Sequence, residues 1–365
     1  MITVSLCMIV KNEEDVLKRC LASAAPLADE IIIVDTGSTD ATKGIAAKYT
    51  AKVFDYPWQN DFAAARNYSF AQASMEYCLW LDADDMIPEK EAEKFLQLKQ
   101  TLPDHTNTVM MKYHYASDAY GNPTQTFFRE RLIRNIPELR WQGFIHEYIQ
   151  PFGNVIYADI AILHLKEHSV PMRNLEIYNK KINEGVKLSP RDQFYYAKEL
   201  YYNQNYICAA AQFNVFLEGN QGWVENNIEA CRYLSYCYTA LQQPEQALRA
   251  LFSSFIYDIP QAETCCDIGK YFIEQKAYAI AAFWYQTALE QEPRLWSGAF
   301  ISPDCYTYIP CIALCMCHYF LGDTALAIDY NERAGTYKPY GEEYLYNKNF
   351  FSSLTYLTPE IIEEE

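Results

Sequence analysis

The sequence lacks any segment that would cross a membrane or direct export. No stretch approaches about 18 consecutive apolar residues, and no basic amino-terminal region leads into an apolar run. Residues 1–10 are apolar, but the polar run Lys11-Asn12-Glu13-Glu14 follows at once, which indicates a buried strand that ends in a loop. We therefore expect a protein without a transmembrane segment.

Positive charge is also scarce. The chain has 30 Lys and Arg residues against 47 Asp and Glu residues, which gives a formal net charge of -17. Binding to a nucleic acid or to an anionic membrane requires a basic surface. The composition therefore argues against both kinds of partner.

The 12 cysteines lack the spacing of a metal site or of a disulfide scaffold. They form no convincing CxxC or Cys/His zinc pattern, and most lie in apolar helical stretches, where a thiol acts as a small hydrophobic group. We expect free thiols and a reducing, cytoplasmic location.

Residues 1 to about 115 alternate between strand and helix patterns. This order is typical of a mainly parallel sheet with helices on both faces, in which ligands bind beyond the carboxyl ends of the strands. The predicted strands cover residues 4–10, 31–34, 53–54 and 77–81, and the predicted helices cover 13–25, a stretch from 41 onwards, and 62–73.

Acidic residues follow one of these strands. Asp82 and Asp84, separated by Ala83, come directly after residues 77–81. Two carboxylates this close repel each other unless a cation holds both. Mg²⁺ or Mn²⁺ would remove the repulsion and bridge the carboxylates to a diphosphate. The alternative is a solvated acidic turn before a helix.

Asp35 closes the second predicted strand and is followed by Gly37 and Ser38. A carboxylate here can accept a hydrogen bond from a ring N–H of a uracil-type base, and a glycine lets the backbone approach a ligand closely. The alternative is an ordinary turn that caps the next helix. Arg66, on a helix rich in small residues, can either reach a phosphate or form a surface ion pair.

Four motifs follow one another in the first domain. They are SLCMIVKNEE at 5–14, DEIIIVDTGSTD at 29–40, ARN at 65–67 and LDADD at 81–85. In this order they resemble family 2 glycosyltransferases of the GT-A fold. Within that family the chain is similar to the branch with lipopolysaccharide-core glucosyltransferases and bacteriocin S-glycosyltransferases, several of which carry tetratricopeptide repeats. The resemblance covers roughly residues 3–165.

The resemblance implies an inverting transfer and assigns roles to these motifs. Asp35 would contact the nucleobase, and Asp82 and Asp84 would bind the ribose and the metal–diphosphate, with Asp84 the more direct ligand. The expected metal ligands are Asp84, Asp82 and His164, and the ion would be Mn²⁺ or Mg²⁺. The residues expected to bind the nucleotide sugar are Val10, Asn12, Glu14, Asp35, Gly37, Ser38, Arg66, Asp82, Ala83 and Trp141.

The segment after a predicted hairpin (109–115 and 124–133) contains Trp141, His146 and Glu147. The resemblance implies that it forms the acceptor side of the site. Glu147 is the preferred general base, which would take a proton from a hydroxyl or thiol, and His146 is the alternative. A structural ion pair for Glu147 and a core position for Trp141 remain open.

His164 ends a predicted strand at 159–164. By resemblance it would be the third protein ligand of the metal, and a hydrogen-bonded histidine at a strand end is the alternative. His168, which lies beyond the strand, is a weaker candidate.

From about residue 190 the chain has helical patterns with a repeat. A turn residue stands five positions before an alanine in four segments, 205–210, 242–247, 276–281 and 322–327. This spacing resembles tetratricopeptide repeats, whose period is 34 residues and whose small residues let paired helices approach closely. The longest step carries an insertion at 296–304, which is expected to be an exposed loop.

We therefore predict an α/β GT-A domain at 1–170, a linker helix at 171–190 and an all-α tetratricopeptide-like solenoid at 191–357. The predicted function is transfer of a sugar from a nucleotide diphosphate donor, with a UDP-sugar favoured, to a hydroxyl or thiol. The repeats would position a peptide, protein or glycan acceptor. Two alternatives are an inactive scaffold that binds peptides through the repeats, and a nucleotidyltransferase, which the lack of a Gly-rich basic loop disfavours.

Overall fold

The computed structural model describes residues 1–165 and 172–355. They form two compact units. The first comprises Met1–Asn203 and Leu295–Phe300, and the second comprises Gln204–Arg294 and the residues from Ile301 onwards. The predicted boundary between residues 170 and 171, like His168, lies outside the described residues, and the predicted domain limits stay a prediction.

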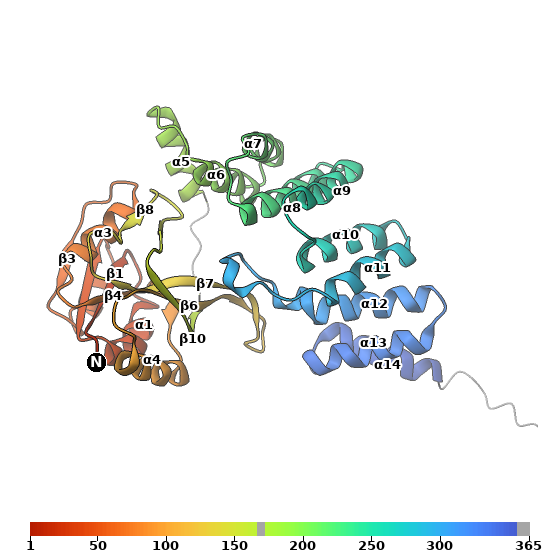
Figure 1. Ribbon diagram of the computed structural model, residues 1–365, viewed down its shortest axis with the longest axis horizontal. Helices are drawn as coiled ribbons and strands as arrows, with labels where there is room; N and C mark the ends of the chain where they lie inside the picture. The colour runs from red at the N-terminus through yellow and green to blue at the C-terminus, as the bar shows by residue number, and fades with distance from the viewer. Residues whose placement is uncertain (166–171, 356–365) are drawn as a thin grey trace, which may run out of the picture. The chain divides into compact units, whose positions relative to one another are not determined.

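The first unit is built on an eight-stranded sheet (Figure 1). The strand order across it is β3-β2-β1-β4-β7-β6-β10-β5. A separate two-stranded ribbon is formed by β8 (Trp141–Gln142) and β9 (Tyr148–Ile149). The strands of the main sheet are β1 (Val4–Val10), β2 (Glu30–Asp35), β3 (Val53–Asp55), β4 (Tyr77–Trp80), β5 (Asp85–Met86), β6 (Thr106–Ser117), β7 (Pro123–Arg134) and β10 (Asn154–His164).

Parallel pairing dominates the amino-terminal half of the sheet. β1 lies between β2 and β4 and is parallel to both, and β3 is parallel to β2. β7 runs antiparallel to β4 and to β6, so β6 and its parallel neighbour β10 point the same way as β4. The carboxyl ends of β2, β4, β6 and β10 therefore meet at one edge. The predicted α/β class is confirmed, and the predicted hairpin is the pair β6 and β7.

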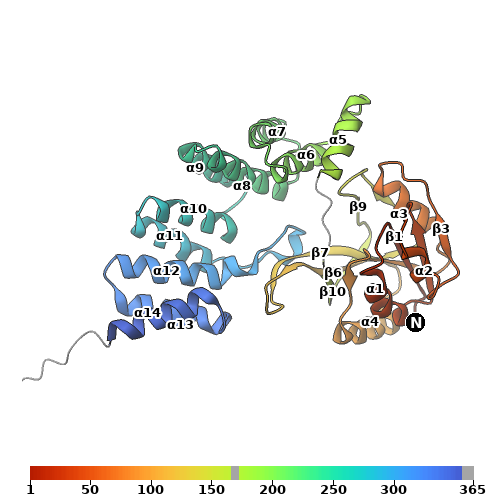
Figure 2. The ribbon, with the colours of Figure 1, turned by 180° about the vertical axis from the view of Figure 1, so that it is seen from behind.

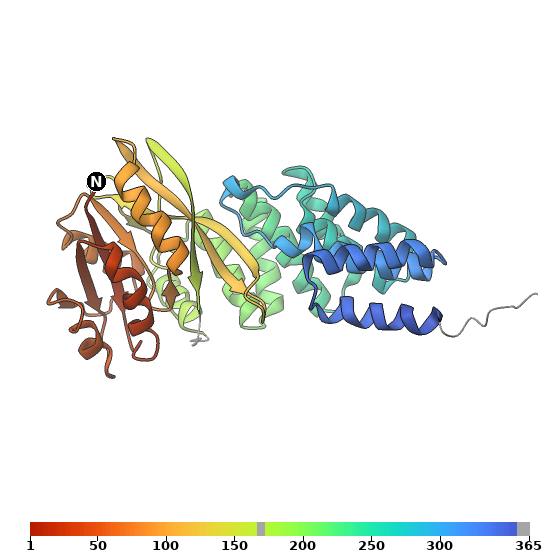
Figure 3. The ribbon, with the colours of Figure 1, turned by 90° about the horizontal axis from the view of Figure 1, so that it is seen from below.

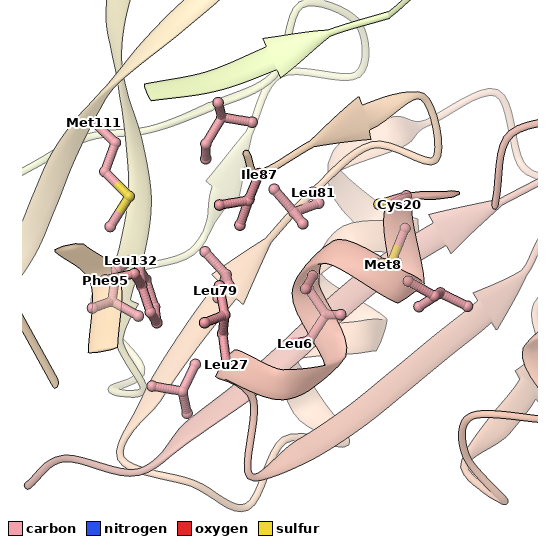
Figure 4. Packing of buried hydrophobic residues seen from close by; sticks show 14 of the residues in the cluster. Leu6, Met8, Cys20, Leu27, Leu79, Leu81, Ile87, Phe95, Met111 and Leu132 are labelled. Atoms are coloured by element: carbon pink, nitrogen blue, oxygen red, sulfur yellow. The ribbon is translucent and has the colours of Figure 1, made fainter. Parts of the chain in front are cut away.

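Helices cover both faces of this sheet (Figures 1 and 2). α1 (Leu17–Ala24), α2 (Thr42–Ala46) and α4 (Glu89–Thr101) pack on one face, and α3 (Phe62–Ala71) packs on the other. The larger core cluster lies under the first group, and Figure 4 shows Leu6 and Met8 of β1 among its side chains. Alternate residues of a buried strand reach opposite faces, which is why Leu6 joins one cluster and Cys7 the other.

Two further helices belong to the first unit, α5 (Arg173–Asn183) and α6 (Pro190–Tyr202). Ser189 and Asp192 form a reciprocal capping box that starts α6. Ile177 and Tyr178 of α5 form a buried cluster with Ile145, which precedes the predicted acceptor-side residues. The helices therefore hold the segment that carries His146 and Glu147.

The second unit is entirely helical, and its consecutive helices lie side by side (Figure 3). This is the helical-repeat architecture that the sequence predicts. Its helices are α7 (Tyr206–Glu218), α8 (Val224–Ala240), α9 (Pro244–Ser253), α10 (Ala262–Glu274), α11 (Tyr278–Leu289), α12 (Tyr308–Phe320), α13 (Thr324–Tyr337) and α14 (Glu342–Thr355).

A left-handed residue marks the turn at the start of each repeated frame. Positive φ angles occur at Gln204 (60°), Gln242 (58°), Lys276 (57°) and Gly322 (88°). The alanine five positions later is fully buried in the first, third and fourth frames and nearly so in the second: Ala209, Ala247, Ala281 and Ala327. The first frame therefore starts one residue earlier than the spacing suggests, with Ala209 in the aligned position in place of Ala210.

Small residues allow the repeat helices to approach closely. Gly269 of α10 lies against Tyr285 of α11, and a Cβ added at this glycine would come within 2.6 Å of the tyrosine ring. All 12 cysteines are free, and only Cys208 is exposed. Among the helices that the structure describes, none combines the length and the apolar character needed to cross a bilayer.

A buried carboxylate ties the amino-terminal edge of the sheet together. Glu30 accepts hydrogen bonds from the backbone and the hydroxyl of Ser74, each 2.8 Å long, and from the side chains of Ser5 and Lys52. Burial raises the pKa of Glu30, but these donors outweigh it and lower the pKa to about 2. The charged form is therefore favoured in the folded state.

We expect Glu30→Gln to lower the melting temperature at pH 7. A depressed pKa contributes stability above the unfolded value near 4.5, and this contribution is lost as the pH falls towards 2. The melting temperature of the wild type should fall as the pH drops from about 4.5 to 2, and that of the variant should fall less over the same range. Identical pH profiles for the two proteins would contradict the assignment.

Candidate active site

The acidic loop follows β4 at the carboxyl edge of the sheet. It holds three carboxylates within four residues, Asp82, Asp84 and Asp85, and each has a different set of partners. Leu81 and Ala83 are buried and fix the loop on the core. The loop lies at the carboxyl edge of the sheet, as the sequence predicts.

Arg66 links the acidic loop to the acceptor-side segment. Its Nη2 donates to Asp82 Oδ1 and its Nε donates to Glu147 Oε1, both at 2.6 Å. The guanidinium lies 4.9 Å from the ring centroid of Trp80 and 4.8 Å from that of Trp141. Burial lowers the pKa of Arg66, but the two carboxylates outweigh it and raise the pKa. The surface ion pair considered from the sequence is thus a buried bridge between two expected functional groups.

The same ion pair sets the charge of Asp82. Burial raises the pKa of this carboxyl, but the guanidinium groups of Arg66 and Arg131 outweigh it and hold the pKa well below its usual range. Asp82, one of the expected metal ligands, therefore stays ionised with Arg66 as its counter-charge.

Asp85 is fully buried and accepts three hydrogen bonds. Its Oδ2 accepts hydrogen bonds from Arg131 Nη1 at 2.8 Å and from the backbone N–H of Asp82 at 2.9 Å, and its Oδ1 accepts one from the Tyr113 hydroxyl at 2.8 Å. Arg131 is fully buried and lies 3.8 Å from the Trp80 ring centroid. Asp85 therefore orients the acidic loop from beneath.

His164 meets the acidic loop through a short strand that the sequence did not indicate. The residues of β5 pair antiparallel with the end of β10, with His164 opposite Asp85, and Leu165 N donates to Asp84 O at 2.9 Å. The imidazole Nδ1 is consequently 3.3 Å from Asp84 Oδ1 and 3.4 Å from Asp85 Oδ1. It is buried and makes no well-aligned hydrogen bond with either carboxylate.

Asp84, Asp85 and His164 can hold a cation. One ligand atom from each lies within 4.8 Å of the others. Burial of the imidazole lowers the pKa of His164, but the two carboxylates outweigh it and raise the pKa to about 9. Two oxygen ligands and one imidazole nitrogen suit Mn²⁺, and a divalent cation would replace the proton that now balances the carboxylates. The poorly satisfied Nδ1 fits this role.

Asp35 offers a second unsatisfied group at the same edge. Its Oδ1 accepts the backbone N–H groups of Gly37 at 3.0 Å and Ser38 at 2.9 Å, while its Oδ2 is buried without a partner. Gly37 has a φ of 109°, a conformation that residues with a Cβ rarely adopt. The turn thus leaves one carboxylate oxygen of Asp35 without a hydrogen-bond donor.

The other expected nucleotide residues near Asp35 hold two loops together. Asn12 accepts from the backbone N–H of Thr39 at 2.8 Å and donates its own N–H to the Ser38 hydroxyl at 2.9 Å. Glu14 accepts from the backbone N–H of Ala41 at 2.9 Å. The carbonyl of Val10 accepts from Thr36 N at 2.9 Å. These contacts fix the loop after β1 onto the loop after β2.

Glu147 and His146 point into different surroundings. Glu147 faces Arg66, as described, and its side chain is 12% exposed. His146 has a left-handed backbone, with a φ of 49°, and its Nε2 lies 2.9 Å from Oε1 of Glu199 on α6. The ring of Tyr195 stacks on the imidazole at a centroid distance of 4.1 Å. The two candidate bases are thus held by separate sets of residues.

Trp141, expected among the nucleotide-sugar residues, lies in the core. Its side chain is buried, and its ring meets Trp80 edge-on at 4.8 Å and Phe70 at 6.0 Å. Together with Trp80 it encloses the Arg66 guanidinium. The core position left open by the sequence is the one observed.

Three residues of this arrangement escaped the sequence analysis: Asp85, Arg131 and Glu199. Asp85 stood in the LDADD motif, so an acidic residue directly after the expected ligand was the available signal. Arg131 lies within a predicted strand, where a charged residue between Glu130 and Leu132 could have indicated a buried ion pair. Glu199 carries no local signal, because it reaches His146 across 53 residues of sequence.

Parts of this chain are similar to a known family and to known proteins. The family described as glycosyl transferase family 2 matches residues 5–157. A TPR repeat-containing protein of Synechococcus elongatus is 39% identical over 157 residues, which cover 41% of this chain and 36% of that protein. The glycosyltransferase SunS of Bacillus subtilis is 26% identical over 195 residues, which cover 50% of this chain and 40% of SunS.

A third relative is the lipopolysaccharide core biosynthesis glycosyltransferase LpsC of Rhizobium meliloti. It is 28% identical over 204 residues, which cover 52% of this chain and 73% of LpsC. This chain therefore spans less than half the length of the first two relatives and most of the third.

Solved structures resemble each half of the chain at low TM-scores. Glucosyl-3-phosphoglycerate synthase from Mycobacterium tuberculosis, in complex with Mg²⁺ and UDP, gives a TM-score of 0.27 at 24% identity and covers 31% of this chain and 44% of that chain. PilF of Pseudomonas aeruginosa gives 0.38 at 16% identity and covers 49% and 74%. The fold rests on the topology described above, and the sequence matches show that residues 5–157 are similar to glycosyl transferase family 2.

Proposed function

We propose that the protein is a metal-dependent glycosyltransferase that moves a sugar from a nucleotide diphosphate donor, a UDP-sugar in the favoured case, to a hydroxyl or thiol acceptor. The observation that carries the proposal is the meeting of Asp84, Asp85 and His164 at the carboxyl edge of the sheet. Asp35, with one unsatisfied carboxylate oxygen, stands at the same edge after β2.

The donor would extend along this edge. Asp35 Oδ2 would accept the N–H of a uracil-type base, and Asp82, held ionised by Arg66, would face the ribose. Asp84 and His164 would bind Mn²⁺ or Mg²⁺ directly, and Asp85, which also accepts hydrogen bonds from Arg131, Tyr113 and a backbone donor, would supply the third ligand atom. The bound cation would neutralise charge on the diphosphate leaving group.

Glu147 would act as the general base for the acceptor. Arg66 forms ion pairs with both Glu147 and Asp82, so Glu147 would face the bound donor. Arg66 engages Oε1, and Oε2 would receive the proton as the acceptor attacks the sugar carbon. Attack on the face opposite the leaving group would invert the configuration at that carbon.

His146 remains the second candidate for the base. Its pairing with Glu199 and its stacking on Tyr195 fix the imidazole, which is the arrangement that orients a histidine for proton transfer. The helical repeats of the second unit would bind a peptide, protein or glycan acceptor, since repeat arrays present extended binding surfaces. We retain a cytoplasmic location as part of the proposal.

We expect UDP with Mn²⁺ to raise the melting temperature, because the pair binds only the folded state. At about 100 times the dissociation constant this binding would contribute about 2.7 kcal/mol. Asp84→Ala and His164→Ala should each abolish the metal-dependent part of the shift, as measured by differential scanning fluorimetry with and without Mn²⁺. Asp104→Ala, which removes an exposed carboxylate before β6, is the control and should keep the full shift.

A metal-dependent shift of wild-type size in both Asp84→Ala and His164→Ala would exclude this cation site. If no nucleotide raised the melting temperature of the wild type, the proposed function itself would be contradicted.

Glu147→Gln preserves the shape of the side chain but cannot accept the proton. Transfer should fall by about 10²-fold or more, while the affinity for UDP with Mn²⁺ stays within about twofold. The measurement is single-turnover transfer beside isothermal titration with UDP. His146→Gln is the matched variant, and we expect its loss to be smaller.

Because Glu147 also balances Arg66, the melting temperature of both variants has to be recorded. Full transfer in Glu147→Gln together with a large loss in His146→Gln would assign the base to the His146–Glu199 pair.

A further inference from the structure

A short segment from the repeat-bearing part of the chain belongs to the first unit. Leu295–Phe300 lies between α11 and α12 in sequence, yet its contacts place it in the first unit. The sequence predicts an exposed loop at 296–304, and Trp296 is 63% exposed. Phe300, in contrast, packs against the main core cluster of the first unit.

The two aromatic residues of this segment touch opposite faces of the sheet. Trp296 stacks on Phe128 at a centroid distance of 5.3 Å, and Phe300 lies 4.2 Å from Phe127. Phe127 and Phe128 are neighbours on β7, so their side chains point to opposite faces. The ring of His164 lies on the Phe127 face, because Tyr113 and Tyr115 contact both rings.

Phe300 lies on the face of the candidate metal site. Its ring meets Tyr115 edge-on at 6.0 Å, and Tyr115 stacks on the His164 imidazole at 5.1 Å with an interplanar angle of 10°. Tyr115 is 39% exposed, so an aromatic surface is open to a ligand beside a candidate metal ligand. Lys198 on α6 lies 5.2 Å from the Phe300 ring and helps to fix it.

The sheet order indicates which part of a donor would reach this surface. Asp35 ends β2, the acidic loop follows β4, and Tyr115, Phe127 and His164 lie on β6, β7 and β10 beyond it. In a nucleotide sugar the base, the diphosphate and the sugar follow one another in that order. With the base at Asp35 and the diphosphate at Asp84, the sugar extends towards Tyr115 and Phe300.

We propose that Tyr115 and Phe300 form an aromatic wall that contacts the transferred sugar of the nucleotide-sugar donor; this inference rests on the proposed function. The apolar C–H face of a hexose packs on aromatic rings, and ligand sites combine such rings with few polar groups. The wall adds a specificity element from outside the family match, because Phe300 lies well beyond residue 157.

The test compares two substitutions within one segment. Phe300→Ala removes the wall, and Trp296→Ala removes an equivalent ring contact on the opposite face of the sheet. Dissociation constants of the full-length protein with Mn²⁺ would be measured for UDP, UDP-glucose, UDP-galactose and UDP-N-acetylglucosamine. UDP lacks the sugar and therefore reports on the base and diphosphate alone.

We expect Phe300→Ala to bind the preferred nucleotide sugar about tenfold more weakly while its affinity for UDP stays within about twofold. Trp296→Ala should match the wild type for all four ligands. Phe300→Tyr keeps the ring and should restore most of the affinity, which also covers the case in which the alanine variant fails to fold.

Either of two results would rule out this contact between the aromatic wall and the sugar. One is an equal loss of affinity for UDP and the nucleotide sugar in Phe300→Ala, and the other is an equal effect of the Phe300 and Trp296 substitutions. If the wild type binds UDP and the sugar nucleotides not at all, the proposed function itself fails, and with it the wall.

Discussion

The repulsion among three carboxylates in one tight loop is the constraint on which the candidate site depends. Asp82, Asp84 and Asp85 cannot all stay charged at the edge of a buried sheet without compensation. Each receives its own cationic partner: Arg66 for Asp82, Arg131 for Asp85 and the protonated His164 for Asp84. Only the last partner can be exchanged for a metal ion, because the two guanidinium groups stay charged and are enclosed.

A guanidinium group that is buried beside the site loses hydration, and this loss has to be compensated by contacts within the protein. Trp80 provides such contacts, since Arg66, Arg129 and Arg131 lie 4.9, 4.9 and 3.8 Å from its ring centroid. Cation–π contact recovers part of the hydration that each group loses on burial. The indole therefore connects the chemistry of the acidic loop to the packing of the sheet, and Trp141 on the other side of Arg66 completes the enclosure.

The helical part of the chain contributes to the first unit at more than one point. Glu199 and Tyr195 of α6 hold His146, and Leu295–Phe300 brings Phe300 to the neighbourhood of His164. Both elements lie outside residues 5–157, the part that matches the family. Segments outside the matched residues thus contact His146 and the surroundings of His164, whereas Asp35 and the acidic loop lie within the matched residues.

The sequence by itself determined the local elements and the edge of the sheet at which the candidate site lies. Apolar runs predict β1, β2 and β4 within a residue at most boundaries, and the polar residues after them predict Asp35 and Asp84 at the carboxyl edge. The repeated frame follows from the sequence in its last three copies, whereas the structure moves the first copy to Gln204 and Ala209. These features depend on neighbours within a few residues.

The tertiary structure alone decided which distant groups meet. The two-residue strand β5 is too short to leave a periodic signal, yet its pairing with β10 brings His164 to Asp84 across 80 positions of sequence. The pairing of Asp82 with Arg66, the core position of Trp141 and the approach of Glu199 and Phe300 to the site are likewise set by packing. Such contacts depend on the relative placement of whole elements, and no local pattern of residues encodes that placement.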